Sequence, residues 1–119
     1  RERLNAEAFT SDEPVGFAAV DQSLLPGPLP EEQWSYIPER LWHRLLKLGA
    51  AYELHFSAIV EPVIDTVLVP SQCETLAAEV EFLLAVVNDP ALEAVISPLL
   101  SAARTVASQS KLRLVLSPP

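Results

Sequence analysis

An apolar stripe in the second half of the chain places the tightest constraint on the fold. Its members recur at spacings of three and four residues and are Cys73, Leu76, Ala77, Val80, Leu83, Leu84 and Val87. At about 100° per residue they span about 120° of a helix surface, the width of a face that packs on a core. The spacing predicts a helix from 72 to about 88. Ser71 and Glu74 form the S-x-x-E pattern of a capping box, which indicates Ser71 as the N-cap.

A second helix is predicted directly after the first. Asp89 and Pro90 suit the N-cap and the first position of a helix that runs from about 90 to 108. Pro98 falls inside this segment and, with Ser97 as a cap, could split it into two short helices. The apolar stripe keeps its phase across the proline, which favours one kinked helix.

An earlier helix is predicted from the segment WSYIPERLWHRLLKLG. Its apolar residues again recur at spacings of three and four, which predicts a helix from about 36 to 48. Pro38 suits the first turn of such a helix, and Gly49 suits the position just after its end.

Four segments have the patterns of strands. VGFAAVD is a short apolar strand at 15–21, and KLRLVL alternates between apolar and polar residues at 111–116. AYELHF alternates at 51–56, as expected of a half-buried strand. VIDTVLV at 63–69 is β-branched and apolar on both faces, which is typical of a central strand. A helical period also fits residues 50–62, so a helix remains the alternative there.

Together these segments predict an α+β fold, in which a small sheet of three to four strands packs on three helices. The approximate order is β-α-β-β-α-α-β. The length of 119 residues suits a single domain over 1–119. Residues 1–33 contain the PGPLP sequence, and we expect them to form a loosely ordered, proline-rich N-terminal segment.

The composition limits the partners and the compartment. Sixteen carboxylates against eight Lys and Arg give a net charge of −8. This balance repels a phosphate backbone and favours a basic protein surface, so we expect no nucleic-acid partner. No apolar run approaches the roughly 18 residues of a membrane span, and RERLNAEAF lacks the apolar segment of a signal peptide. A single cysteine cannot form an internal disulfide, which fits a reducing, cytoplasmic setting.

The motifs of common catalytic and cofactor sites do not occur in the sequence. Three glycines are too few for a phosphate loop or a dinucleotide fingerprint. The two histidines and the cysteine lack the spacings of zinc ligands. Glu53, His55 and Ser57 share one face of a predicted strand, but such side chains project in parallel and do not converge as a triad. We expect no catalytic residues, no metal and no cofactor.

Three polar or reactive residues are candidates for a pocket between the sheet and the helices. Cys73 belongs to the apolar stripe, which favours a packed core thiol over a nucleophile activated by a helix N-terminus. Asp65 lies inside an otherwise apolar strand, which indicates either a sheet edge or a buried acid in a pocket. His55 would be the third polar group of this candidate pocket.

The outer side of helix 72–88 is a candidate interface. Phe82 lies nearly opposite the apolar stripe with Val86 near it, and Glu79 and Glu81 lie on either side. Either the proline-rich segment folds over this face, or the face is a partner surface with an aromatic anchor and an acidic rim.

Helix 36–48 carries the basic cluster of the chain. Its members cover about 100° of one helix face and are Arg40, His43, Arg44 and Lys47. This cluster is either a patch for an anion or an acidic partner, or a solvated face that pairs with glutamates of other elements.

The sequence therefore predicts a non-enzymatic, small acidic protein–protein interaction domain of the inhibitor, immunity or adaptor type. It would bind another protein, basic in character, or a second copy of itself through the acidic, partly apolar helical surface around Phe82. The alternative is a small-molecule binding domain or minor enzyme, with a pocket between sheet and helices that contains Asp65, His55 and Cys73.

Overall fold

The computed structural model describes residues 14–25, 27, 29–55 and 65–117. The strands are β1 (Pro14–Asp21), β2 (Ser35–Pro38), β3 (Thr66–Leu68) and β4 (Leu112–Ser117). The helices are α1 (Glu39–Ala51), α3 (Pro70–Val86) and α4 (Pro90–Ala107), and short 3-10 helices occur at η2 (Gln22–Leu24) and η3 (Glu31–Gln33). The order is β-β-α-β-α-α-β, so the predicted α+β fold is confirmed.

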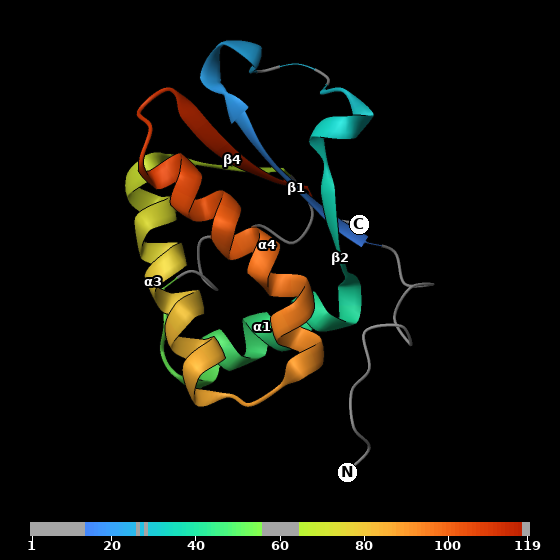
Figure 1. The fold of residues 1–119 in the computed structure, drawn as a ribbon, viewed down its shortest axis with the longest axis vertical. Coiled ribbons are helices and arrows are strands. Elements are labelled where there is room, and N and C mark those ends of the chain that lie inside the picture. The colour runs from blue at the N-terminus through green and yellow to red at the C-terminus, as the bar shows by residue number, and fades with distance from the viewer. Residues whose placement is uncertain (1–13, 26, 28, 56–64, 118–119) are drawn as a thin grey trace.

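The strands form a four-stranded antiparallel sheet in the order β2-β1-β4-β3. The two long strands, β1 and β4, are therefore central, and the two short ones are at the edges. Figure 1 shows α3 and α4 running side by side, with α1 crossing near their ends. β1 begins at residue 14, so part of the proline-rich N-terminal segment is a central strand.

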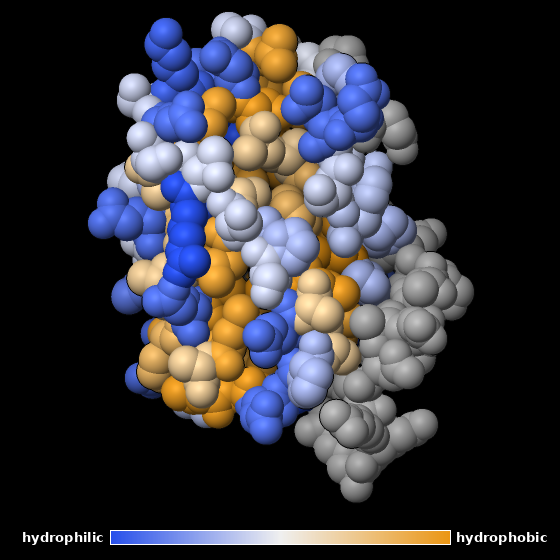
Figure 2. Space-filling model, viewed as in Figure 1, coloured by the Kyte–Doolittle hydropathy of each residue, from blue (hydrophilic) through white to orange (hydrophobic). Residues whose placement is uncertain are grey.

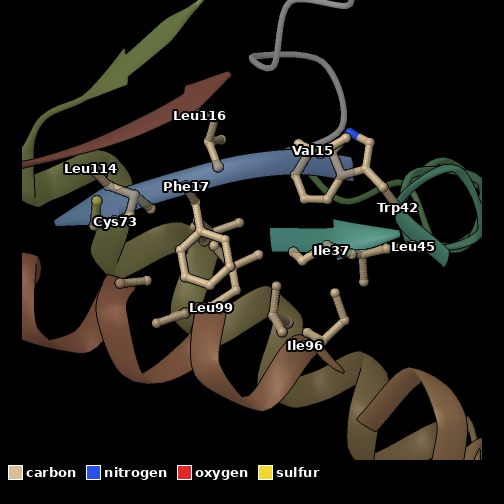
Figure 3. Packing of buried hydrophobic residues seen from close by; sticks show 14 of the residues in the cluster. Val15, Phe17, Ile37, Trp42, Leu45, Cys73, Ile96, Leu99, Leu114 and Leu116 are labelled. Atoms are coloured by element: carbon tan, nitrogen blue, oxygen red, sulfur yellow. The ribbon is translucent and has the colours of Figure 1, made fainter. Parts of the chain in front are cut away.

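The core lies between the helices and one face of the sheet. Alternate residues of the central strands point into it, including Phe17 of β1 and Leu114 and Leu116 of β4, all of which are buried. Figure 3 shows Phe17 directed toward Leu99, with Cys73 beside Leu114. The predicted stripe of α3 is the face that α3 turns to this core.

The opposite face of the sheet has a smaller cluster formed by Ala18, Val20 and Val115. Partly buried residues of the loop between β1 and β2 pack against it, namely Leu25, Leu29 and Trp34. The described part of the proline-rich loop therefore covers the sheet, on the side away from the helices.

The helix predicted from residue 36 begins later, because its first residues form β2. Steric contact with a proline ring favours an extended backbone in the residue before it, here Ile37. Pro38 is itself extended (φ −54°, ψ 137°) and is the N-cap of α1. Ser35–Pro38 pairs with the first half of β1. Gly49, predicted to follow the helix, is buried inside α1.

The strand predicted at 51–56 is wrong where the structure describes it. Ala51 is the last residue of α1, and residues 52–55 form a turn after the helix. Phe56 lies outside the described residues. Leu54 packs against the core as part of this helix end, so its apolar character does not reflect the alternation of a strand.

The start of α3 also differs from the prediction. Its N-cap is Val69 rather than Ser71, and Pro70 takes the first helical position. The Val69 N–H donates to Oε1 of Gln72 at 3.0 Å, which is the role predicted for Glu74. Proline suits this position because it has no N–H to leave unsatisfied and its φ is already helical.

β3 lies inside the predicted strand 63–69, of which residues 63 and 64 are outside the described residues. It is an edge strand and not the central strand predicted, and its Val67 is 47% exposed on the outer side of the sheet. α4 is a single helix with Pro98 inside it, as predicted.

Candidate functional site

The side of α3 that faces away from the core has a cluster of exposed apolar side chains. Phe82 and Val86, one turn apart, are 44% and 48% exposed. Tyr52 at the end of α1 packs edge-on against Phe82, with ring centroids 5.6 Å apart and an interplanar angle of 80°. Together with the exposed Ala78 and Ala85 they form a surface that we call the Phe82 patch. Figure 2 shows hydrophobic residues at the surface around the end of α3 and the link to α4.

The end of α1 positions Tyr52 in this patch. The Glu53 N–H donates to Ala50 O at 3.0 Å, and the Leu54 N–H donates to Gly49 O at 2.8 Å. These two bonds are those of a Schellman motif, which requires a left-handed residue after the helix. Glu53 takes this conformation with φ 58°. Tyr52 was missed as a site residue because its segment has the pattern of a strand.

Glu79 connects this helix end to α3 and is not an exposed rim residue. Its Oε2 accepts a hydrogen bond from the His55 N–H at 2.8 Å and lies 3.1 Å from His55 Nδ1. The Glu79 side chain is only 12% exposed, whereas His55 is 84% exposed. The carboxylate therefore holds the residues after α1 against α3, next to Phe82.

Glu81 pairs with Arg104 of α4, and both side chains are more than half exposed. An exposed pair of this kind stabilises a fold by about 0–1 kcal/mol. Part of the predicted acidic rim is thus neutralised. Glu53 and Glu74 are exposed carboxylates on the two elements that form the patch.

One member of the predicted basic cluster, Arg44, forms an ion pair within the fold. Arg44 donates from Nε to Oδ2 of Asp89 at 2.7 Å, so it links α1 to the start of α4. The other three members, Arg40, His43 and Lys47, are exposed. The role of these three as an anion or acidic-partner patch stays a prediction.

The three candidate pocket residues contact different parts of the structure. Cys73 is fully buried beside Leu114 (Figure 3), and burial raises the pKa of its thiol to about 11. Asp65 is exposed at the sheet edge and accepts a hydrogen bond from Ser117 Oγ at 2.9 Å. His55 lies on the outer side of α3. None of the described contacts joins these residues to one another.

Neither a metal cluster nor a membrane-spanning helix is found in the part of the chain that the structure describes. No group of three or more His, Cys, Asp and Glu residues there could hold a metal ion. No helix there is long and apolar enough to cross a membrane.

Comparisons with known proteins gave no relative: no family model matches the chain, and neither a curated protein nor a solved structure matches it. The function is therefore inferred from the geometry of this chain alone. In the Phe82 patch, an aromatic side chain from the end of α1 packs against an aromatic side chain of α3.

Proposed function

We propose that this protein is a non-enzymatic interaction domain of the inhibitor, immunity or adaptor type, which binds another protein through the Phe82 patch. The observation that carries the proposal is the edge-on pair of Tyr52 and Phe82, both nearly half exposed. Aromatic side chains supply large contact areas and are enriched among the residues that dominate binding energy. An exposed apolar cluster on a charged surface is typical of a site that a partner covers.

The proposed partner is basic around an apolar contact surface. The chain has a net charge of −8, and Glu53 and Glu74 lie exposed on the elements that form the patch. A field of this sign accelerates encounter with a positively charged protein and disfavours acidic ones. The apolar centre would supply affinity, and the carboxylates would supply selection of the partner.

The test compares two variants in which an apolar side chain of similar exposure is replaced by aspartate, one inside the patch and one outside it. Phe82→Asp introduces a charge into the patch, whereas Val67→Asp introduces one on the outer side of the sheet, where Val67 is 47% exposed. Partners captured from native lysate are identified by mass spectrometry, and their Kd values are then measured with purified proteins.

We expect Phe82→Asp to weaken binding by about tenfold or more, equivalent to about 1.4 kcal/mol. Val67→Asp should leave the Kd unchanged, and both variants should melt close to the wild-type temperature. A folded Phe82→Asp variant that keeps the wild-type affinity would overturn the proposal. A dimer in sedimentation experiments that Phe82→Asp abolishes would assign the patch to a second copy of the chain instead.

A further inference from the structure

The second half of β1 has a pairing partner on one side only. β2 pairs with residues 14–17 of β1, and β4 pairs with residues 16–21. Within the described residues, the segment 18–21 therefore has β4 on one side and no strand on the other. Such an edge offers unpaired backbone donors and acceptors, which natural proteins usually cover or shorten.

The register identifies which backbone groups face the open side. The Gln22 N–H donates to Lys111 O at 2.8 Å, and these two residues continue the register of β1 with β4. Hydrogen-bonding residues alternate along an antiparallel pair, so the even-numbered residues of β1 bond to β4. Ala19 therefore directs its N–H and C=O groups, and Asp21 its N–H group, to the side on which β2 has ended. The Asp21 C=O is already used, because Asp21 is the N-cap of η2 and its C=O accepts the first hydrogen bond of that helix.

The chain before β2 turns away from this edge. Continuation of the β1–β2 register would place Gln33 opposite Ala19. Gln33 instead belongs to η3, and its N–H donates to Pro30 O at 3.0 Å. Figure 1 shows the chain leaving β1 through η2 and returning through η3 before it enters β2.

A groove of about 400 Å³ lies at this open edge. One wall is the β1 edge around Ala19, and the other consists of small residues of α4, including Pro98, Ser101 and Thr105. Among the residues that the structure describes, its polar lining residues are serine, threonine and glutamine, and none of the lining residues is charged. This volume lies within the range of about 300–1,000 Å³ that is usual for ligand sites.

We propose that this groove binds a short, extended and uncharged peptide segment of a partner protein, which adds as a strand to the open edge of β1. Extended backbone is the occupant that pairs with the N–H and C=O groups of Ala19 and with the N–H group of Asp21, as in other cases of strand addition. The neutral lining disfavours charged side chains, because these would lose water without gaining a partner of opposite charge. The site is independent of the Phe82 patch, since it uses β1 and α4.

The test is a selection of displayed random short peptides on the full chain. Ser101→Trp fills the groove from an exposed position on its α4 wall. Ala94→Trp is the matched control, because Ala94 is also exposed on α4 but lies about two turns away and outside the lining. The selected peptides are also made with N-methylated backbone amides, which cannot donate to a strand edge.

We expect the selection to yield uncharged, strand-forming peptides. Their Kd should rise about tenfold or more when the protein carries Ser101→Trp or when the peptide backbone is N-methylated. Ala94→Trp should leave the Kd unchanged. In NMR spectra the Ala19 and Asp21 amide signals should shift on binding more than those of Ala18 and Val20. Failure to select any peptide, or equal binding to Ser101→Trp, would overturn the proposal. A dimer of the chain that Ser101→Trp disrupts would also overturn it, in favour of a second copy as the occupant.

Discussion

Asp89 and Arg44 form an ion pair whose carboxylate serves two helices at once. Arg44 of α1 donates from Nε to Asp89 Oδ2 at 2.7 Å. Oδ1 of the same carboxylate accepts the Leu92 N–H at 3.2 Å and so caps α4. Asp89 is only 9% exposed, and among the residues that the structure describes it is the one charged residue that is buried. One side chain thus both begins α4 and fixes α1 against it.

We expect Asp89→Ala to lower the free energy of unfolding by about 2–4 kcal/mol. Loss of an N-cap costs about 0.5–2 kcal/mol, and loss of a hydrogen bond to a charged group costs about 1.5–3 kcal/mol. Asp89→Asn keeps a capping oxygen and should cost less. Urea unfolding measures these changes. Arg104→Ala, which breaks the exposed pair with Glu81, is the control and should cost at most about 1 kcal/mol. Equal losses in Asp89→Ala and Arg104→Ala would contradict this account.

The sequence predicts the capping role of Asp89 but not its ion pair with Arg44. The cap was predictable because Asp89 and Pro90 are adjacent and their helix preferences are local. The partner was not, because Arg44 lies 45 residues away and its pattern on α1 is that of a surface cation. Only the packing of α1 against α4 brings the two charges together.

The left-handed residue after α1 gives a second prediction. Glu53 has φ 58°, a conformation that costs about 1–2 kcal/mol for a residue with a Cβ and little for glycine. We expect Glu53→Gly to raise the free energy of unfolding by about 0.5–1 kcal/mol, since part of the gain is lost to the greater freedom of the unfolded chain. Thermal and urea unfolding measure the change.

The control for Glu53→Gly is Ala50→Gly, in the last turn of the same helix. Glycine within a helix costs about 1 kcal/mol relative to alanine, so this variant should be less stable. If Glu53→Gly also destabilised the protein, residue 53 would not have the left-handed conformation.

The errors at the two ends of α1 have a common physical origin. Sequence periodicity marks the apolar face of an element, but helix ends depend on single backbone positions. At the start, Pro38 forces an extended segment that pairs with β1. At the end, Glu53 occupies a position where glycine is the usual signal, so nothing in the sequence marked it. Because this helix end was not predicted, Tyr52 was not recognised as a residue of the site.

Cys73 should react slowly with alkylating reagents in the native protein. Its side chain has no exposed area, and burial raises the pKa of its thiol to about 11. Because the thiolate is the nucleophile and the pKa of an unburied thiol is 9.0, we expect labelling at least about 100-fold slower than for free cysteine. Iodoacetamide labelling followed by mass spectrometry measures this rate. Denaturant should restore fast labelling, and a native rate equal to that of free cysteine would show that the thiol is exposed.

The same burial predicts a pH dependence of stability. The Cys73 pKa is about 11 in the folded protein and 9.0 in the reference state, so between these values the unfolded chain loses a proton that the folded chain keeps. Ionisation then favours the unfolded state, and stability falls as pH rises through this range, by about 2–3 kcal/mol. Urea unfolding of the wild type and of Cys73→Ala, measured between pH 9 and 11, isolates the contribution of the thiol, because all other groups titrate equally in the two proteins. Parallel curves for the two proteins would refute it.

Gly16 leaves room for Trp34 on the outer face of the sheet. A Cβ at position 16 would lie 3.0 Å from Trp34 Cε3 and 3.4 Å from Tyr36 Cε1. We therefore expect Gly16→Ala to lower stability by about 1–3 kcal/mol through overpacking, although alanine suits a strand better than glycine does. Trp34 should become more exposed, and its fluorescence emission should shift to longer wavelength.

A double-mutant cycle tests whether this contact is the cause. In a Trp34→Ala background the added methyl group no longer meets the Trp34 ring and makes only an ordinary van der Waals contact with Tyr36 at 3.4 Å, so Gly16→Ala should cost nothing or stabilise the strand. The fluorescence of Trp42, buried in the core, provides the internal reference and should stay constant in every variant. A cost that persists without the Trp34 ring would mean that glycine is needed at position 16 for its backbone, and that the proline-rich loop is not held on the sheet by this contact.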